Sequence, residues 1–407
     1  MTETSPSPAA ALTLGGAAAS LVLPRADDLV AFRRDLHAHP ELAWAEKRTT
    51  HLVAEHLEQH GLAVQLLPGT GLLAETGPVT AAPLLALRAD LDALPLDDVT
   101  ADPWSSRVAG VCHACGHDVH TTALLGAGLA LHDLHREGRL PGRVRLIFQP
   151  AEEVMPGGAH DVLAAGGLAG VGRVFALHCD PSLDVGTVGL REGPITAASD
   201  SVHVRLTGRG GHTSRPHLTD DLTYALAKVV TDVPAALSRV IDPRAAVSMV
   251  WGVVRAGVAR NVIPAFGELA GTVRMLDVSA WDGAEAVVTR LVHEVVAPYG
   301  VRAEVDYVRG VPPVVNEAVS AALLERAAAT VLGEHGVRPA EQSMGGEDFA
   351  WFLEEVPGAL LRLGTRTPGG RTYDLHQGDL RVDDSSVVIG AALLAQAAVE
   401  ALRHGEI

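Results

Sequence analysis

The sequence predicts an α/β fold, with a mixed, largely parallel sheet flanked by helices and a smaller α+β domain inserted into it. Short apolar runs at 84–87, 144–148 and 174–177 are typical of buried parallel strands, and helical patterns alternate with them. Polar and apolar residues alternate after position 201, as expected for half-buried strands. Two kinds of strand in one chain indicate two domains.

The helices of the larger domain are predicted from apolar residues at helical spacing and from the proline or glycine that ends each pattern. Apolar residues from Leu29 to Leu36 share one helical face, and the pattern ends before Pro40. A second helix is expected from about 46 to 60, where Gly61 provides a suitable C-terminal cap. The last helix is expected from Ser385 to His404.

The inserted domain is expected at 196–305, between 26–195 and 306–407 of the larger domain. Within it the order is strand, helix, two strands and helix, with the first strand starting near Ser201. Residues 1–25 are expected to form a disordered tail. They do not resemble a signal peptide, because no basic residue precedes Arg25.

Composition narrows the class of function. A length of 407 residues favours two domains, and 32 basic against 49 acidic residues give a net charge of −17, which disfavours binding to nucleic acid or anionic membranes. No run of 18 uncharged apolar residues predicts a membrane span. Three cysteines are too few for a disulfide framework, so we expect a cytoplasmic protein.

The densest chemical signal is the segment CHACGHDVH from Cys112 to His120, which places thiols, imidazoles and a carboxylate before a helix expected near Thr121. These groups are ligands for zinc and similar metals. A redox pair, half of a zinc knuckle, a deaminase site and a purely structural cluster are the alternatives. No second cysteine pair completes a knuckle, and no His-x-Glu precedes Cys112 as a deaminase requires.

Three further segments supply groups of the same chemistry. One strand leads to Glu152 and Glu153, whose side chains should point to opposite sides if the backbone is extended, so that one binds metal and the other acts as general base. Another strand ends at His178, and His376 follows a glycine-rich loop where Asp374 or a backbone carbonyl could orient it. The candidate metal ligands are therefore Cys115, His117, Glu153, His178 and His376. Five ligands suit two metals, with Cys115 as the bridging thiolate.

The chain resembles the metallo-aminoacylase and carboxypeptidase family of zinc peptidases. The closest subgroup contains hippurate hydrolases, N-acyl-amino-acid amidohydrolases and plant auxin-conjugate hydrolases. The resemblance covers nearly all of the chain after residue 26 and is carried by these ordered motifs: DLHAHPELAWAEKRTT from Asp35, LRADLDALPLDD from Leu87, GVCHACGHDVHT from Gly110, FQPAEE from Phe148, ALHCDP from Ala176, GRGGHTSRPH from Gly208, NVIP from Asn261, GTVR from Gly271, MGGEDFAWF from Met344 and YDLH from Tyr373.

The resemblance implies the same five metal ligands, with Glu152 as general base. It implies that His212 stabilises the oxyanion, often from the partner subunit, and that Asn261 and Arg274 bind substrate, although Arg274 could instead form a surface ion pair. Asp90 and Asp92 would orient the ligands. Two divalent ions are implied, zinc or manganese, with cobalt or nickel as substitutes in vitro. A homodimer, or a tetramer built from dimers, would form through the inserted domain, which would also act as a lid.

The resemblance has departures that affect the expected substrate. Many relatives have Met where this chain has Cys112, and the residues that follow His178 and His376 also differ. The reaction expected is therefore hydrolysis of N-acyl amino acids of the hippurate type. The alternatives are a dipeptidase or carboxypeptidase with the same site, a metal-binding or amino-acid-binding protein, and a redox sensor that uses Cys112 and Cys115.

Overall fold

The computed structural model describes residues 13–79 and 84–405. The chain divides into two compact units. Unit 1 is made of Met1–Gly193, Val315–Glu341 and Trp351–Ile407, and unit 2 of Pro194–Val314 and Gln342–Ala350. Unit 2 thus extends past the expected boundary at 305 and also takes a segment from the C-terminal part of the chain.

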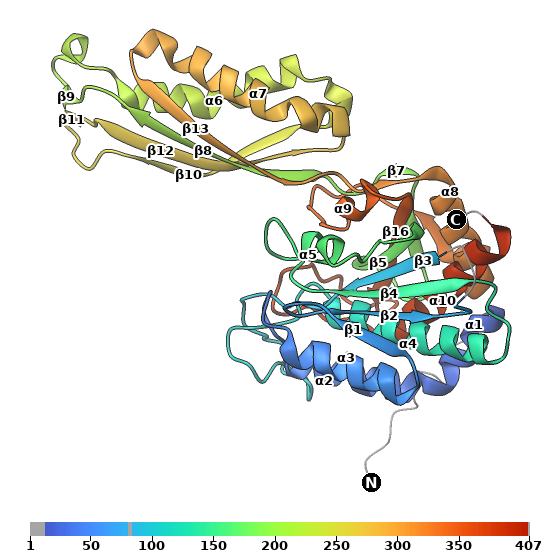
Figure 1. The fold of residues 1–407 in the computed structure, drawn as a ribbon. Coiled ribbons are helices and arrows are strands. Elements are labelled where there is room, and N and C mark those ends of the chain that lie inside the picture. Colours follow the sequence, from blue (N-terminus) through green and yellow to red (C-terminus); the bar gives the residue numbers. More distant parts are fainter. Residues whose placement is uncertain (1–12, 80–83, 406–407) are drawn as a thin grey trace. The chain divides into compact units, whose positions relative to one another are not determined.

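Unit 1 contains a mixed eight-stranded sheet, which confirms the predicted fold class (Figure 1). The strands joining β4 to β16 through β3 and β5 are parallel, and antiparallel strands lie towards the edges. Across the sheet the order is β1 (Ala63–Leu66), β2 (Leu72–Thr76), β4 (Arg143–Gln149), β3 (Leu84–Asp90), β5 (Val171–Asp184), β16 (Gly358–Arg366), β6 (Val188–Leu190) and β15 (Val337–Pro339).

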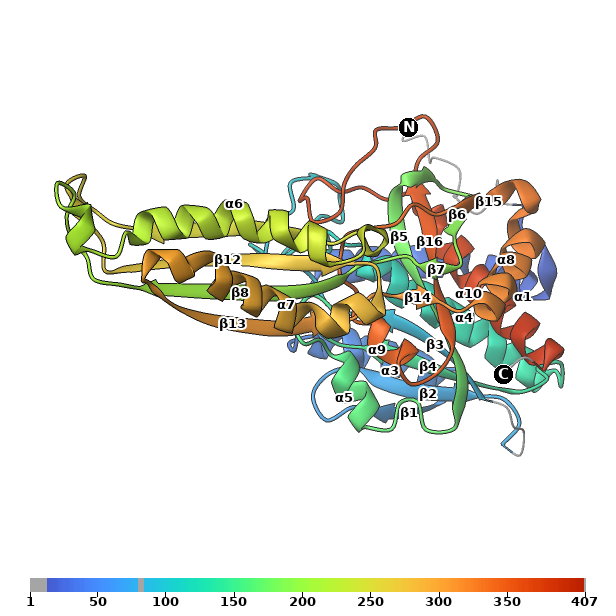
Figure 2. The same ribbon diagram turned by 90° about the horizontal axis from the view of Figure 1, so that it is seen from above.

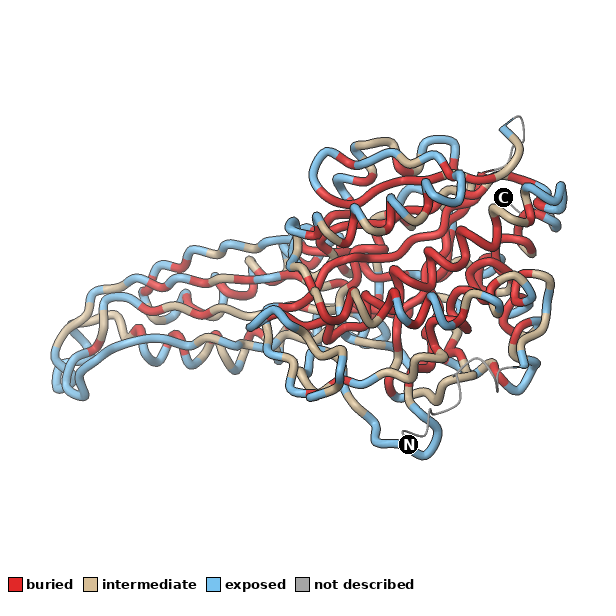
Figure 3. Tube along the Cα trace, turned by 90° about the horizontal axis from the view of Figure 1, so that it is seen from below, coloured by how far each residue is buried: buried red, intermediate tan, exposed pale blue. Residues whose placement is uncertain are grey.

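A layer of helices packs against this sheet. The long helices α4 (His117–Arg136) and α10 (Ser385–His404) contact each other and the central strands. Around them lie α1 (Gly16–Val22), α2 (Ala26–Ala38), α3 (Lys47–Gln59) and α8 (Ala318–Leu332), while the short α5 (Ala159–Ala164) contacts β4. The buried residues of unit 1 gather in the sheet and in this layer (Figure 3), and all seven residues of β3 are buried.

Helix α10 is apolar because it is a core helix. It is the one helix in the described part of the chain that is long and apolar enough to cross a membrane, but 89% of its apolar window is buried inside the protein. Burial on most sides explains its composition without a lipid phase.

The prediction of a disordered tail at 1–25 is wrong for its last thirteen residues, and the first twelve lie outside the described residues. Residues 16–22 form α1, in which Ala18, Ala19 and Val22 are completely buried against the core. The helix packs on α10 and α4. The apolar residues of α1 are therefore part of the hydrophobic core.

Unit 2 is an α+β unit, as predicted. Its antiparallel sheet has the order β10 (Ser248–Ala256), β12 (Phe266–Met275), β8 (Ala198–Thr207) and β13 (Arg302–Val311). Helices α6 (Leu222–Val240) and α7 (Val278–Val296) lie along one face of this sheet (Figure 2). Burial alternates along β8, because one side of that strand faces the helices and the other does not.

The boundary of unit 2 differs from the prediction because of a long-range pairing. Strand β13 pairs with β8, with Arg302 opposite Thr207 and Val311 opposite Ser199. Local patterning near Tyr307 could not reveal this partner. Two-residue strands, β7 (Gly193–Pro194) and β14 (Val315–Asn316), lie where the chain leaves and re-enters unit 1, and α9 (Ala350–Leu353) lies at the second boundary.

Candidate metal centre

The candidate centre lies at the carboxyl ends of the parallel strands β3 and β4 of unit 1, beside the part of β5 that carries His178. Strand β5 itself continues to Asp184, so the expectation that this strand ends at His178 is wrong. Asp90 at the end of β3 is in register with Gln149 at the end of β4, and Arg88 is in register with Ala176 of β5. His178 therefore lies level with Asp90, and Glu152 follows β4 by three residues. Ligands in open α/β sheets bind at this edge.

The segment from Cys112 turns sharply into α4 at Gly116, which has φ +84°. A Cβ at this position would lie 2.8 Å from the Sγ of Cys179, so only glycine fits the close approach to β5. The helix begins at His117 rather than near Thr121, because the glycine turn comes earlier than the apolar pattern suggests. Cys115 and His117 are thereby placed on either side of the turn.

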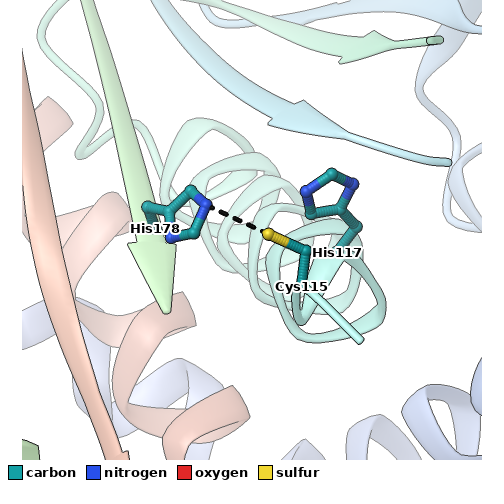
Figure 4. Close-up of side chains that lie close together, drawn as sticks. All are labelled: Cys115, His117 and His178. Atoms are coloured by element: carbon teal, nitrogen blue, oxygen red, sulfur yellow. Dashed lines mark hydrogen bonds between the residues drawn. The ribbon is translucent and has the colours of Figure 1, made fainter. Parts of the chain in front are cut away.

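Cys115, His117 and His178 form the first set of possible ligands (Figure 4). The Sγ of Cys115 lies 3.5 Å from Nε2 of His178. Because Nδ1 of His178 donates to the carbonyl of Cys179 at 2.8 Å, its Nε2 carries a free lone pair. Sulfur and nitrogen ligands on one tetrahedral zinc ion are also about 3.5 Å apart, given bonds of about 2.3 and 2.0 Å.

The imidazole of His117 is oriented by Asp92. Its Nδ1 lies 3.3 Å from Oδ1 of Asp92, while Nε2 faces Glu152 and Glu153 at 4.0 and 3.8 Å. A carboxylate behind a histidine is the usual support of a metal-binding ring. Burial alone would lower the pKa of His117, but Asp90, Asp92 and Glu153 outweigh it and raise the pKa to about 10. This part of the site therefore favours positive charge.

Cys115 belongs also to a second set, with Glu153 and His376. Nε2 of His376 lies 3.2 Å from Oε1 of Glu153, and the pKa of His376 is raised by that contact. The backbone of His376 has φ +60° and its N–H donates to the carbonyl of Ala114. Asp374, which we expected could orient His376, instead accepts a hydrogen bond from the N–H of Leu375.

Glu152 and Glu153 lie on a tight turn, so the expectation that they continue an extended strand is wrong. Strand β4 ends at Gln149, and Ala151 has φ +53°. The turn is fixed by two buried carboxylates. Asp92 accepts the N–H groups of Glu152 and Glu153 at 3.0 Å each, and Glu46 accepts the N–H of Ala151 at 2.8 Å. Each glutamate side chain is still about one tenth exposed.

Asp90 acts on the centre through His120. Its carboxylate accepts from Nη1 of Arg88 and from Nδ1 of His120, both at 2.7 Å. Nε2 of His120 in turn accepts the backbone N–H of Cys179, next to His178. Burial would raise the pKa of Asp90, but the charges of His117, His120 and Arg88 hold it well below its usual range.

Sequence reasoning did not assign roles to Glu46 or His120. Glu46 stands within the first matching motif and His120 within the cysteine–histidine motif, but nothing local shows what they touch. Their partners, Ala151 and Cys179, are 105 and 59 positions away. Only the fold brings these pairs together.

The donor set fits divalent metal ions. Both ring nitrogens of His117 and Oε1 of Glu153 are buried without a hydrogen bond in the described part of the chain, although ion-pair partners lie near. Such atoms are rare unless something else satisfies them. Burial raises the pKa of the Cys115 thiol well above its usual range, and Glu153, Glu152 and Asp90 add to this effect, so a cation is needed to favour the thiolate. The two ligand sets share Cys115, as a bridging position requires.

The three remaining candidate residues lie in unit 2, with His212 and Asn261 beyond one end of its four-stranded sheet and Arg274 near the other end. His212 is on β9 (Gly211–His212), which pairs with β11 (Val262–Ile263) next to Asn261 (Figure 1). Arg274 lies near the far end of β12, eight residues beyond Phe266, or roughly 26 Å along a strand. Its Nη1 donates to the carbonyl of Met344 at 2.6 Å, whereas the alternative of a surface ion pair would need a carboxylate. The structure brings His212 and Asn261 together, and keeps Arg274 apart from them.

The sequence matches peptidase family M20/M25/M40 over residues 86–400, which is most of the chain. The chain belongs to this family. The M20 assignment agrees with the resemblance carried by the sequence motifs, and it makes the chain a hydrolase rather than a binding protein or a redox sensor.

Individual M20 relatives show how far the likeness extends. An N-acetylcysteine deacetylase of Bacillus subtilis is 37% identical over 375 residues, covering 91% of this chain and 96% of the relative. A protein of Rhodococcus jostii named as a glutamate–cysteine ligase is 51% identical over 367 residues. That match covers 90% of this chain, but the chain spans only 46% of the Rhodococcus protein.

A solved structure of an M20 relative supports both the fold and the binuclear character of the site. It is a dinuclear metal-binding peptidase of Bacillus subtilis, 34% identical, with a TM-score of 0.82 over 93% of this chain and 99% of that one.

Proposed function

We propose that this chain is a metal-dependent amidohydrolase that cleaves the amide bond of N-acyl amino acids. The observation that carries the proposal is the pair of ligand sets sharing Cys115, with Glu152 beside them and outside both. Relatives named as deacetylases of an N-acylated amino acid support the substrate class. We propose zinc or manganese as the native metal, with Cys115, His117, Glu153, His178 and His376 as ligands.

Two ions in this centre would polarise the amide carbonyl and lower the pKa of the attacking water. Glu152 is placed for the proton transfers, because its Oε2 lies 4.0 Å from Nε2 of His117 and its backbone is held by Asp92. Its carboxylate takes the proton of the attacking water and returns it to the leaving nitrogen. Asp92 and Glu46 keep the carboxylate in position throughout.

We propose further that His212 reaches the site of a partner subunit. Arg274 lies roughly 26 Å along β12 from Phe266, and His212 lies on β9, which pairs with β11 just before Phe266, so one subunit cannot apply both to a single small substrate. A homodimer or a dimer-based tetramer resolves this separation. The edge strand β10 carries exposed apolar residues, Val250 and Val254, which suit pairing with a second copy.

Unit 2 would then act both as dimerisation surface and as lid. We place the enzyme in the cytoplasm, since all three cysteines are free and buried.

The first experiment measures metal content and hydrolysis together. Purified enzyme is assayed on hippurate-type and N-acetyl amino acids and on dipeptides, before and after chelation and after metal is restored. About two ions per chain at the centre and reversible loss of acyl-amino-acid cleavage are expected. Metal without hydrolysis of any amide would refute the proposal. Faster cleavage of dipeptides than of acyl amino acids would favour the dipeptidase alternative.

The role of the partner subunit is tested by mixing two inactive variants, Glu152→Gln and His212→Ala. If His212 acts across the dimer, a mixed dimer contains one complete site, and random exchange restores about a quarter of the wild-type rate. If His212 acts within its own subunit, neither site of a mixed dimer is complete. A mixture whose hydrolysis rate is no greater than the sum of the rates of the two separate variants would therefore contradict the action of His212 across the interface.

A further inference from the structure

A second group of metal-binding side chains lies in unit 1, beside the candidate centre but separate from its ligands. It consists of His37 at the end of α2, Asp98 in the loop after β3, and Cys112. One ligand atom from each lies within 4.8 Å of the others. All three are screened from solvent, with side-chain exposures of 5% for His37 and 1% for Asp98, while Cys112 is 2% exposed. None has a role in the proposed hydrolysis.

The imidazole of His37 is oriented as a metal ligand would be. Its Nδ1 lies 2.8 Å from Oδ2 of Asp118, so this nitrogen donates its proton to the carboxylate. Nε of Arg33 also pairs with Oδ2 of Asp118, at 2.7 Å. Nη2 of Arg33 lies 3.3 Å from Nδ1 of His37, and because both nitrogens carry protons this contact is not a hydrogen bond. Nε2 is left facing Asp98. A carboxylate that binds the far nitrogen fixes the ring in the same way at known metal sites.

The separation between Nε2 of His37 and Oδ2 of Asp98 is 3.3 Å. A charge-assisted hydrogen bond between such groups is usually about 2.7–2.9 Å long. Nitrogen and oxygen ligands of one tetrahedral zinc ion, each about 2.0–2.1 Å from it, are about 3.3 Å apart. The carboxylate itself is held in place by the N–H groups of Thr100 and Ser106, each at 2.8 Å.

One divalent ion would balance the charge of the occupied cluster. With a neutral His37 and a Cys112 thiolate bound to the ion, Asp98, Asp118 and the thiolate carry three negative charges and Arg33 carries one positive charge. A further observation points the same way. The neighbouring His113 is 2% exposed, and neither of its ring nitrogens has a hydrogen-bond partner in the described part of the chain. Its ring centre lies 6.3 Å from that of His37.

We propose that His37, Asp98 and Cys112 bind an additional divalent ion of the zinc class, distinct from the ions of the hydrolytic centre. Imidazole, carboxylate and thiolate together are a zinc donor set. The ion would join the end of α2, the loop after β3 and the segment that leads to Cys115. Its role is structural, because it would fix the position of the chain segment that precedes Cys115.

The test compares wild type with Cys112→Met. Methionine keeps an apolar, flexible sulfur side chain at this buried position, so the variant should fold, yet a thioether is a poor zinc ligand. Metal content is measured by mass spectrometry after dialysis under reducing conditions. We expect about three ions per chain in wild type and about two in Cys112→Met, with hydrolysis unchanged. Cys179→Ala serves as the matched control, because it removes a buried thiol outside the cluster and should keep all three ions.

Cobalt substitution gives a second readout. With cobalt in both sites, thiolate-to-metal absorption comes from two bonds of the bridging Cys115 and one of Cys112, so Cys112→Met should remove about a third of it. Asp98→Asn should lower the metal content in the same way, without removing a thiol. Equal metal content and equal absorption in wild type and Cys112→Met would overturn the proposal, and so would loss of hydrolysis at unchanged metal content. The alternative is that a charged His37 bridges two carboxylates, and it predicts equal metal content.

Discussion

The carboxylate of Glu46 accepts a 2.8 Å hydrogen bond from the backbone N–H of Ala151, 105 positions along the chain. Ala151 has φ +53°, a conformation that costs a non-glycine residue energy, and it directly precedes Glu152. The same carboxylate accepts from the hydroxyl of Thr70 at 2.6 Å and is completely buried. Glu46 thus fixes the turn that aims the proposed general base.

Removing the Glu46 carboxylate should therefore slow the chemical step. In Glu46→Ala we expect kcat to fall by about 10- to 100-fold with little change in KM, because a small displacement of a catalytic group is costly. Glu46→Gln keeps an amide oxygen that can accept the N–H of Ala151, so it should retain most of the activity. Steady-state kinetics on an N-acyl amino acid measure both values. A loss of bound metal, or a higher KM at unchanged kcat, would contradict this positioning role.

Two neighbouring glutamates should respond differently to the same substitution. Glu152→Gln should keep both ions of the centre but lower kcat by about 10²- to 10⁴-fold, as for loss of a general base. Glu153→Gln should lose metal, because Glu153 belongs to two of the possible ligand sets. Metal analysis beside kinetics separates the two effects. Near-normal turnover of Glu152→Gln would remove this residue from the proposed mechanism.

His120 should control metal affinity without touching the ions. It accepts the N–H of Cys179 and donates to Asp90, so His120→Ala loosens the part of β5 that carries His178. We expect metal affinity to fall by about 10- to 100-fold, the usual effect of removing a residue that supports a ligand. Competition with a chromophoric chelator measures the affinity. His51→Ala, an exposed histidine on α3, is the control, and an equal affinity in both variants would contradict the prediction.

Much of the architecture could be predicted because the signals are local. The apolar runs form β3, β4 and β5, and the last helix spans the expected Ser385–His404. A strand buried on both faces, or a helix buried on most sides, is apolar over a short stretch of sequence, so it can be recognised from that stretch alone. The motifs likewise indicated residues that the structure places together, including Cys115, His178 and Glu153.

The features that sequence did not reveal depend on long-range contacts. The backbone of Ala151 is left-handed only because Glu46 and Asp92 hold the turn from elsewhere in the fold. Strand β13 joins unit 2 because β8 offers it an edge, which the pattern around Tyr307 does not encode. The separation of His212 from Arg274 follows in turn from the length of β12.

The N-terminal carboxylate of α8 predicts a pH-dependent stability. Burial would raise the pKa of Glu317, but hydrogen bonds from Ser320 and Arg173 outweigh it and lower the pKa to about 2. In the unfolded chain the pKa is about 4.3, so the stabilisation is complete above that pH and is lost as pH falls towards 2. Glu317→Gln should be less stable than wild type at pH 7, and the gap should narrow below about pH 4.

Urea unfolding at pH 7, 4 and 3 measures this gap. Glu325→Gln is the control, because Glu325 is exposed on the same helix and should show no gap at any pH. A gap for Glu317→Gln that stays constant down to pH 3 would show that the carboxylate charge does not stabilise α8.

The helix α1 should contribute to the stability of unit 1, in contrast to the tail that its composition suggested. Val22 is completely buried where α1 packs on α10 and α4, and burial of such a side chain is worth about 1.5–3 kcal/mol. Val22→Ser removes that burial and adds a hydroxyl, so the free energy of unfolding should fall by about 2 kcal/mol or more. Ser20→Ala, on the exposed side of the same helix, should change it by less than about 0.5 kcal/mol. Denaturant unfolding followed by circular dichroism measures both variants. If Val22→Ser unfolded at the same denaturant concentration as wild type, α1 would be attached to the core too weakly to matter, and residues 16–22 would behave as the tail that was first expected.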